Sequence, residues 1–295
     1  MQTSLVEVKG LTKKYKKFTL GPLDFKVERG IVIGLVGANG SGKSTLFRLL
    51  MNLLKEDDGQ IQMFGRTHSN HVWKQKVGYA GELLEAYEFL SINELKRLIS
   101  RWYPTWDEEM YEKLVKRYKL DVSEKFSKCS KGTKKKVEFI FSLCHHPELL
   151  LLDEPTAGVD LASQRKVKED LLMFMDDGEK SIVLATHTVD EINQLCDEIM
   201  VLDQGRVVHT YNKDEIYDHW ARVWVSDITP PIKQHPNVIH YDTAPPQIVT
   251  DDLWVLERAL DKEQIDVQQV QRLALEEVLE YLIDSRKRGD GSAVS

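Results

Sequence analysis

The stretch IVIGLVGANGSGKSTLFRLL, residues 31–50, decides the fold class of the chain. Its opening apolar run ends in glycine, which is typical of a buried strand. The segment Gly37–Ser44 fits the phosphate-loop pattern G-x-x-x-x-G-K-[ST], and a helix is expected from about Gly42 to Leu54. In such a turn, backbone N–H groups and the helix N-terminus hold phosphate oxygens. The stretch therefore predicts a nucleoside triphosphate site, in which Lys43 reaches the β- and γ-phosphates and Ser44 binds Mg²⁺.

A second apolar run, LLLLD at residues 149–153, is followed by a further acid, so that Asp153 and Glu154 stand side by side. An Asp at the carboxyl end of a buried strand can orient Mg²⁺ and its water, and the next acid can polarise an attacking water. Taken alone, the pair could be two solvated acids that follow a strand. In a chain with a phosphate loop, the pair predicts the metal-binding and catalytic carboxylates of a nucleotide hydrolase.

Charge and composition limit the class of protein. The chain of 295 residues has 40 Lys and Arg against 47 Asp and Glu, so its net charge is −7. This balance argues against a general nucleic-acid-binding protein, which usually has a basic domain. The segment KCSKGTKKK, residues 128–136, is a local exception that could bind a polyanion generally or one particular phosphate.

Cysteine usage and hydropathy indicate the compartment. Cys129, Cys144 and Cys196 have no paired spacing and are expected to be free thiols in a reducing compartment. The first residues lack the apolar core of a signal peptide, and no apolar run approaches the ~18 residues that span a bilayer. We therefore expect a cytoplasmic protein, whose partner chain would supply any membrane span.

The character of the sequence changes after about residue 214. Before this point we expect a β-rich segment at 5–33 and a helix from Ser91 toward Arg101, which opens with the capping box Ser91–Glu94. We also expect a mostly helical region at 107–145 with a loop at 123–132, a strand at 181–186, and a hairpin at 199–210 with its turn at 203–205. Beyond it, prolines punctuate short apolar stretches, and a closing amphipathic helix has apolar residues from Leu275 to Leu282. We expect one domain at 1–214, with a helical subdomain at about 83–145, and a small α+β accessory domain at 215–295.

Six motifs, in order along residues 5 to about 213, resemble the ATP-binding subunits of ABC transporters. They are Tyr15, GANGSGKS (37–44), VGYAGE (77–82), CSKGTKKKV (129–137), LLLLDEPTAGVD (149–160) and LATHTVDE (184–191). The fourth motif is specific, because other phosphate-loop families lack it. The fold that this resemblance implies is α/β: a P-loop NTPase domain with an antiparallel β subdomain and a helical subdomain, followed here by the small C-terminal α+β extension.

The resemblance implies an ATPase with ATP and Mg²⁺ as cofactors. Its implied catalytic residues are Glu154 as the base, His187 as the switch histidine at the γ-phosphate, and Lys43. The implied nucleotide-binding residues are Tyr15, on which adenine stacks, Gly37, Asn39, Gly40, Ser41, Gly42, Lys43, Ser44, Thr45, Glu82, Ser130, Gly132 and Asp160, and the implied metal ligands are Ser44, Asp153 and Glu82.

Two of the motifs depart from the family pattern. Glu82 stands where the coupling loop usually has Gln, and it is either a ligand of Mg²⁺ or water, or a plain surface acid. Lys131 and Thr133 replace the second Gly and the Gln of the signature LSGGQ. At least some of Lys134–Lys136, in the helix that follows, are expected on a solvated face.

The implied assembly is a head-to-tail dimer, either a homodimer or a heterodimer with a paralogue. Each ATP lies between the phosphate loop of one subunit and the Ser130 and Gly132 segment of the other. The dimer drives a transmembrane permease subunit on a separate chain, from the cytoplasmic face of the cell membrane, and no nucleic acid takes part.

The membrane helices are expected on the surface around residues 80–102. The nearby aromatic residues either belong to that docking surface or fill the core of the helical subdomain; they are Trp73, Trp102, Tyr103 and Trp106. The C-terminal region resembles that of bacterial exporters of drugs, antimicrobial peptides or lipid-linked substrates. The alternative is a non-transport, regulatory ATPase of the ABC type.

Overall fold

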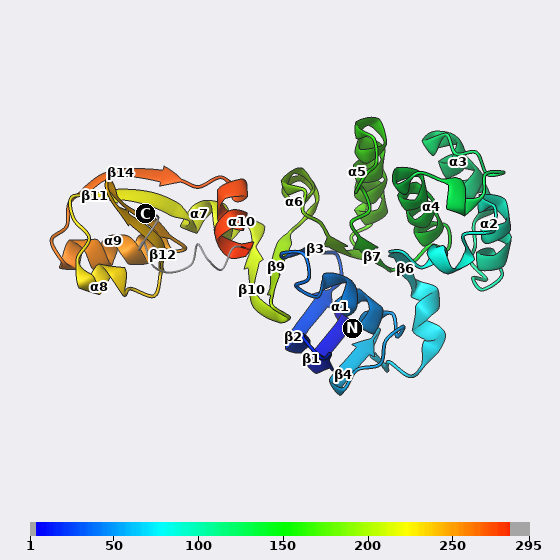
Figure 1. Cartoon of the computed structure of the whole chain (residues 1–295), viewed down its shortest axis with the longest axis horizontal. Helices are drawn as coiled ribbons and strands as arrows, with labels where there is room; N and C mark the ends of the chain where they lie inside the picture. The colour runs from blue at the N-terminus through cyan, green and yellow to red at the C-terminus, as the bar shows by residue number, and fades with distance from the viewer. Residues whose placement is uncertain (1–3, 284–295) are drawn as a thin grey trace. The chain divides into compact units, whose positions relative to one another are not determined.

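The computed structural model describes residues 4–283, and the chain divides into two compact units between Val208 and His209 (Figure 1). This boundary lies slightly before residue 214, where the change in composition placed it. Val207 still packs against the core of the first unit. Tyr211, by contrast, contacts the buried Trp220, with the ring centroids 6.3 Å apart. The chain thus leaves the first core within a strand, where composition gives no signal.

A four-stranded antiparallel sheet forms one layer of the first unit, in the order β2-β1-β4-β5. Its strands are β1 (Ser4–Lys14), β2 (Thr19–Glu28), β4 (Asp58–Met63) and β5 (Arg66–Thr67). Within β1, Val6 and Val8 are buried on one face, as period-two alternation requires. The turn between β1 and β2 carries Tyr15.

A six-stranded sheet forms the second layer, in the order β10-β9-β3-β8-β7-β6. Its strands are β3 (Val32–Val36), β6 (Val77–Ala80), β7 (Leu149–Asp153), β8 (Ser181–Ala185), β9 (Glu198–Asp203) and β10 (Arg206–Asn212). Strands β3, β7 and β8 are parallel and almost wholly buried, which explains their continuous apolar runs.

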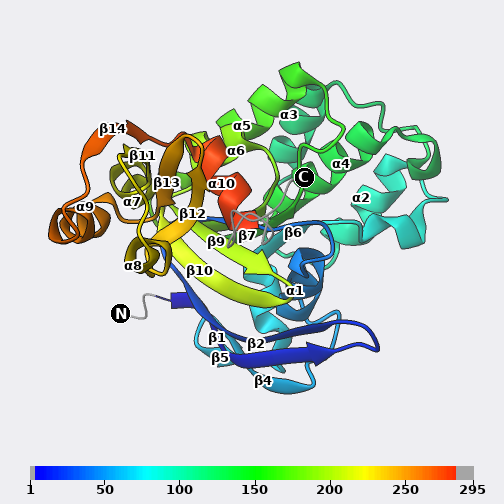
Figure 2. The same ribbon diagram turned by 60° about the vertical axis from the view of Figure 1, so that its left-hand side comes forward.

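Helices cover both faces of the parallel sheet (Figures 1 and 2). Helix α1 (Lys43–Leu50) lies between the two sheets and shares one apolar core with them. Helices α5 (Leu161–Met175) and α6 (Val189–Leu195) lie on the opposite face. Helix α1 ends earlier than Leu54, where the sequence placed its end, because Asn52 adopts the left-handed conformation with φ 52°.

The chain between β6 and β7 is mostly helical. Its elements are the 3₁₀ turn Leu84–Tyr87, α2 (Ile92–Ser100), α3 (Glu108–Tyr118), the 3₁₀ turn Phe126–Lys128 and α4 (Lys131–Leu143). The capping box at the start of α2 is confirmed: Ser91 Oγ accepts from the Glu94 N–H at 3.3 Å, and the Glu94 carboxylate accepts from the Ser91 N–H at 2.8 Å. The loop expected at 123–132 is wrong at its end, because Ser130 caps α4 by accepting from the Thr133 N–H at 3.1 Å.

The predicted hairpin of β9 and β10 is confirmed, and its turn braces the phosphate loop. Gln204 and Gly205 both have positive φ, 45° and 81°, as a two-residue hairpin turn requires. The Gly205 N–H donates to the Ser41 carbonyl at 3.0 Å, and the Gly205 carbonyl accepts from the Gly21 N–H at 2.6 Å. A Cβ at position 205 would lie 2.1 Å from the Thr19 carbonyl oxygen, so only glycine fits.

The second unit contains an antiparallel sheet in the order β12-β13-β11-β14. Its elements are α7 (Lys213–His219), β11 (Ala221–Val225), α8 (Pro230–Lys233), β12 (Val238–Thr243), β13 (Pro246–Thr250), α9 (Leu253–Lys262), β14 (Val267–Arg272) and α10 (Leu275–Ile283). Residues of β11, α8 and α9 enclose an apolar core separate from that of the first unit. None of the helices within residues 4–283 combines the length and apolarity that crossing a membrane requires.

Candidate functional site

The phosphate loop connects β3 to α1 and buries the side chain of Lys43, which is 6% exposed. The Lys43 ammonium donates to the carbonyl oxygens of Gly37 at 2.7 Å and Ala38 at 3.3 Å. Burial lowers the pKa of Lys43, while the carboxylates of Glu154 and Asp153 act in the opposite direction. The loop therefore holds a cation close to two acids at the carboxyl edge of the sheet.

The hydroxyl of Ser41 is also buried in this loop. Its Oγ has no hydrogen-bond partner among residues 4–283, and it lies 2.7 Å from where a Cβ on Gly37 would be. A buried hydroxyl without a partner is unusual in a native structure. Together with the glycines, it fits a ligand that brings oxygen atoms into the loop, as a phosphate does.

The expected metal ligands Ser44 and Asp153 lie together. Asp153 ends β7, and its carboxylate accepts a hydrogen bond from the Ser44 hydroxyl. Burial raises the pKa of Asp153, and this hydrogen bond and the charge of Lys135 oppose the rise. Hydroxyl and carboxylate oxygens suit Mg²⁺, which keeps several waters and needs few protein ligands. Within the described part of the chain, no group of three His, Cys, Asp or Glu residues is placed to share a metal ion.

The side chains of Glu154 and His187 meet at the ends of two adjacent strands. The Nε2 of His187 lies 3.1 Å from Oε1 of Glu154. Glu154 follows β7 with a φ of 50°, and its N–H donates to the Ala185 carbonyl of β8 at 2.9 Å. A non-glycine residue in this conformation is held by its surroundings, and such residues concentrate at functional sites. The structure thus brings together the two residues that the resemblance named as base and switch.

A buried carboxylate that the sequence analysis did not single out supports this pair. Glu191 of α6 accepts from Thr156 Oγ1 at 2.5 Å with one oxygen and from Thr186 Oγ1 with the other. Thr186 Oγ1 in turn accepts from the Thr188 N–H at 3.0 Å. The backbone on both sides of His187 is therefore fixed by hydrogen bonds that start at one side chain of α6.

The signature segment packs against the loop Ala157–Asp160 of the same chain. A Cβ on Gly132 would lie 2.4 Å from the Gly158 carbonyl oxygen, so glycine is required for this approach. The ammonium of Lys136 lies 3.4 Å from the Asp160 carboxylate, which also caps α5 by accepting from the Ser163 N–H at 2.9 Å. The hydrogen bonds from Ser163, together with Lys136, lower the pKa of Asp160 to about 2.

Lys135 was missed by the sequence analysis, which expected some of the three lysines 134–136 on a solvated face. The Lys135 side chain is buried, and its ammonium donates to the Asp153 carbonyl oxygen at 2.9 Å. Lys134 is half-buried over the ring of Phe126, with Nζ 5.1 Å from the centroid. The signal lay in helical spacing, because Gly132, Lys135 and Glu138 share one face of α4.

Glu138 is buried beside Lys135. Burial raises its pKa to about 7; Lys135 opposes the rise, and Glu82 and Glu85 add to it. Its carboxylate also accepts a hydrogen bond from the backbone N–H of Glu82. Glu82 itself is exposed, with a φ of 26°. Its backbone is therefore tied to the signature helix, and its carboxylate remains available to the site.

Tyr15 lies in the β1–β2 turn and is half-exposed. Its ring lies beside Phe18, with the centroids 6.3 Å apart, and its N–H donates to the Phe18 carbonyl at 2.7 Å. The Phe18 ring approaches the phosphate loop, since a Cβ on Gly42 would meet it at 3.0 Å. An exposed aromatic face thus stands beside the start of α1.

The aromatic residues near the expected docking surface have different surroundings. Trp73 is 1% exposed in the core of the first unit, which excludes the docking-surface alternative for this residue. Trp106 packs against Tyr111 and Phe141. Trp102 is 75% exposed, and Tyr103 lines a cavity of about 230 Å³. This cavity, named here the Tyr87 cavity, is lined by Met51, Tyr79, Gly81, Leu83, Leu84, Tyr87, Ile99, Tyr103, Glu138, Phe141, Ser142 and His145.

Comparisons with known proteins agree on the class of this site. A family model described as ABC transporter matches residues 20–157. The fluoroquinolones export ATP-binding protein of Mycobacterium tuberculosis is 32% identical over 212 residues, which cover 70% of each chain. An uncharacterized ABC transporter ATP-binding protein of Methanocaldococcus jannaschii is 30% identical over 219 residues, which cover 71% of this chain and 78% of that relative.

Solved structures agree on the fold. The structure of an ATP-binding subunit of an ABC transporter superposes with a TM-score of 0.65 at 28% identity, over 73% of this chain and 92% of the other. The structure of an ATP-binding cassette in a post-hydrolysis state, bound to ADP and Pi, superposes with a TM-score of 0.63 at 21% identity, over 70% and 98% of the two chains. The share of this chain that superposes, 70–73%, corresponds in length to the first unit.

Proposed function

Since the chain belongs to the ATP-binding proteins of ABC transporters, we propose that it hydrolyses ATP at this site in order to drive a separate membrane subunit of an exporter. The observation that carries the proposal is the joining, at one edge of the parallel sheet, of the phosphate loop with its buried Lys43, the Ser44–Asp153 pair and the Glu154–His187 pair. The direction of transport rests on relatives, among them the fluoroquinolones export protein and a Nod factor export ATP-binding protein of Ralstonia nicotianae.

The proposed roles follow from where the side chains lie. The loop N–H groups and Lys43 bind the β- and γ-phosphates, while Ser44 and Asp153 hold Mg²⁺, with Glu82 as a further ligand directly or through water. The bound Mg²⁺ neutralises charge that develops on the phosphates. Glu154 accepts a proton from the attacking water, and His187 keeps that carboxylate in place and donates toward the γ-phosphate. Adenine stacks on Tyr15.

The test of the base is Glu154→Gln. This substitution keeps the size of the side chain but removes its basicity, so we expect ATP to bind while steady-state hydrolysis falls by about 10²–10⁴-fold. Unchanged hydrolysis would show that Glu154 is not the base. Glu109→Gln, which alters an exposed acid at the start of α3, is the control and should hydrolyse ATP at the normal rate.

We also propose that two copies bind two ATP molecules head to tail, each ATP lying between the phosphate loop of one copy and Ser130 and Gly132 of the other. Support comes from the exposed position of Ser130 at the N-terminus of α4, where a hydroxyl and backbone N–H groups can meet an anion. Asp160, in the loop against which Gly132 packs, lies at the same interface.

Complementation between two inactive variants tests this arrangement. Ser130→Arg and Lys43→Ala should each abolish hydrolysis when all copies carry the change. A mixed dimer should regain one working site, which is built from the intact loop of one copy and the intact signature of the other. If the mixture stayed inactive while both variants still formed dimers, the shared site would be refuted.

We propose that the membrane subunit docks at the Tyr87 cavity. Its apolar lining, and the exposed Phe89 and Trp102 nearby in sequence, suit a helix with an apolar face. Tyr87→Glu should prevent co-purification with a membrane protein encoded beside this chain, and it should leave basal ATP hydrolysis unchanged. Trp254→Glu, at an exposed aromatic residue of α9, is the matched control. Hydrolysis without any such membrane partner would favour a regulatory ATPase instead.

A further inference from the structure

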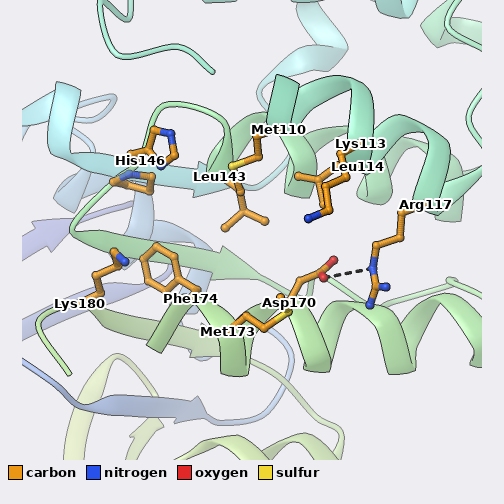
Figure 3. A pocket seen from close by; sticks show the side chains of 11 residues that line it. Met110, Lys113, Leu114, Arg117, Leu143, His146, Asp170, Met173, Phe174 and Lys180 are labelled. Carbon is orange, nitrogen blue, oxygen red and sulfur yellow. Dashed lines mark ion pairs between the residues drawn. The ribbon is translucent and has the colours of Figure 1, made fainter. Parts of the chain in front are cut away.

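A second cavity, of about 250 Å³, lies between α3 and α5 and is named here the α3–α5 cavity (Figure 3). Its lining comes from α3, from the end of α4 and the turn after it, from α5, and from the residue before β8. These residues are Met110, Lys113, Leu114, Arg117, Leu143, His146, Pro147, Asp170, Met173, Phe174 and Lys180. None of them belongs to the phosphate loop, the acidic strand end or the signature segment described above.

Hydrogen bonds and an ion pair hold the two helices together at one end of the cavity. The Nε of Arg117 lies 3.1 Å from the Asp170 carboxylate, and the Tyr118 hydroxyl donates to the same carboxylate at 2.7 Å. Lys166 adds a hydrogen bond to the Arg117 carbonyl at 2.8 Å. Figure 3 shows the Arg117–Asp170 pair at this end, with His146 and Lys180 at the opposite end. The space between the helices is thus fixed by the fold.

The lining is apolar in its middle and cationic in its polar groups. Side chains of α3 and α4 face those of α5 across the space: Met110, Leu114 and Leu143 on one side, Met173 and Phe174 on the other (Figure 3). Asp170 is the one acid of this lining, and it is already neutralised by Arg117. The lining thus has three cations, Lys113, Arg117 and Lys180, against one acid, whereas the chain as a whole has a net charge of −7.

The basic side chains of the lining differ in whether an acid already faces them. Nε2 of His146 lies 3.0 Å from the Asp107 carboxylate, and the Lys180 ammonium lies 2.5 Å from the Asp177 carboxylate; both acids stand outside the lining. Lys113 reaches from α3 into the space between the helices, and its ammonium has no ion pair within residues 4–283 (Figure 3). An anionic group that enters the cavity would therefore meet Lys113.

We propose that the α3–α5 cavity binds an amphipathic organic anion, such as a medium-chain carboxylate. The anionic group contacts Lys113, and the apolar body lies between Leu114, Leu143 and Phe174. Charge complementarity at Lys113 and the apolar walls select this class, because the one acid of the lining, Asp170, is already paired with Arg117, whereas Lys113 has no ion pair among the described residues. The ligand would join α3 to α5, the helix that Asp160 caps. The cavity shares no lining residue with the ATP site, so binding there does not depend on hydrolysis.

Calorimetry on the full chain without nucleotide tests the proposal, with hexanoate, octanoate and decanoate as probes. Affinity should rise by about fourfold for each added methylene that becomes buried. Decylamine, whose apolar chain is one carbon longer than that of decanoate and whose charge is opposite, should not bind. Absence of carboxylate binding, or equal binding of decylamine, would overturn the proposal.

Variants locate the binding. Lys113→Met should weaken decanoate binding by about tenfold or more, because it removes the charge-assisted contact. Lys116→Met changes an exposed lysine of the same helix outside the cavity, and it should leave binding unchanged. Met110→Trp, at a half-buried position, should fill the cavity and prevent binding while leaving ATP binding intact. Decanoate binding that persisted in Met110→Trp would place the ligand elsewhere and refute the assignment.

Discussion

The buried Lys135 offers a sharp test of how the signature helix and the acidic strand are joined. Its ammonium donates to the Asp153 carbonyl at 2.9 Å. Its charge also opposes the rise in pKa that burial causes at Glu138. Lys135→Met keeps the apolar length of the side chain and removes both interactions. We expect the first unit to lose stability, and we expect the loss to depend on pH because Glu138 titrates.

The expected loss follows from these two interactions. A hydrogen bond from a charged group contributes about 1.5–3 kcal/mol. Removing the positive charge near the buried Glu138 carboxylate adds to this when Glu138 is ionised, and the cost of leaving a buried charge without its countercharge reaches about 3–5 kcal/mol. At pH 8, where Glu138 is mostly ionised, Lys135→Met should therefore lower the free energy of opening by about 3–5 kcal/mol. At pH 5, where burial keeps Glu138 protonated, only the lost hydrogen bond counts, and the loss should be about 1.5–3 kcal/mol.

Hydrogen exchange in low urea, read from the peptide that covers α4 and β7, measures this free energy. Peptides of the second unit, which has its own core, serve as an internal reference. The matched control is Lys134→Met, one residue earlier on the same helix, which loses a contact with the Phe126 ring worth about 0.5–1 kcal/mol. A Lys134→Met effect as large as that of Lys135→Met, or equal Lys135→Met effects at both pH values, would refute the reasoning.

Three further outcomes are expected. The folded pKa of Glu138, about 7, lies above its ordinary value of 4.5, so the stability that Glu138 contributes is fully present below pH 4.5 and is lost as the pH rises through 7. Relative to the Glu138→Gln variant, the first unit should therefore lose about 3 kcal/mol of stability between pH 4 and pH 8, measured by the same hydrogen exchange. Gly132→Ala brings a Cβ to 2.4 Å from the Gly158 carbonyl and should lower ATP hydrolysis at least tenfold while ATP binding, measured by fluorescence titration, stays within about twofold. Thr186→Val leaves one oxygen of the buried Glu191 without its donor and should cost about 1–3 kcal/mol, measured by hydrogen exchange around β8.

Local patterns were sufficient to predict most of the fold. The phosphate loop between strand and helix, the capping box at Ser91 and the hairpin turn at Gly205 each depend on residues close together in sequence. The end of α1 was misjudged because the chain stays apolar after Asn52, whereas the helix stops at its left-handed backbone. Hydrophobic pattern cannot report a change in backbone conformation at one residue.

The site was harder to predict where it depends on contacts between distant segments. The pairing of Glu154 with His187 follows from two parallel strands that end at one edge, which sequence order and apolar runs can suggest. The burial of Lys135 requires knowing that α4 packs beside the end of β7. A lysine among four others looks like a solvated residue until that packing is known.

The hairpin turn at Gly205 has a consequence for the modular construction of such proteins. Its backbone bonds to Ser41 and Gly21 support the nucleotide-binding loop from a point only a few residues before the second unit begins. Recombination that exchanged everything after β9 would remove this support, whereas a junction after Val208 would retain it. An exchange of the accessory domain would therefore leave the backbone support of the phosphate loop intact, provided that the junction falls beyond this turn.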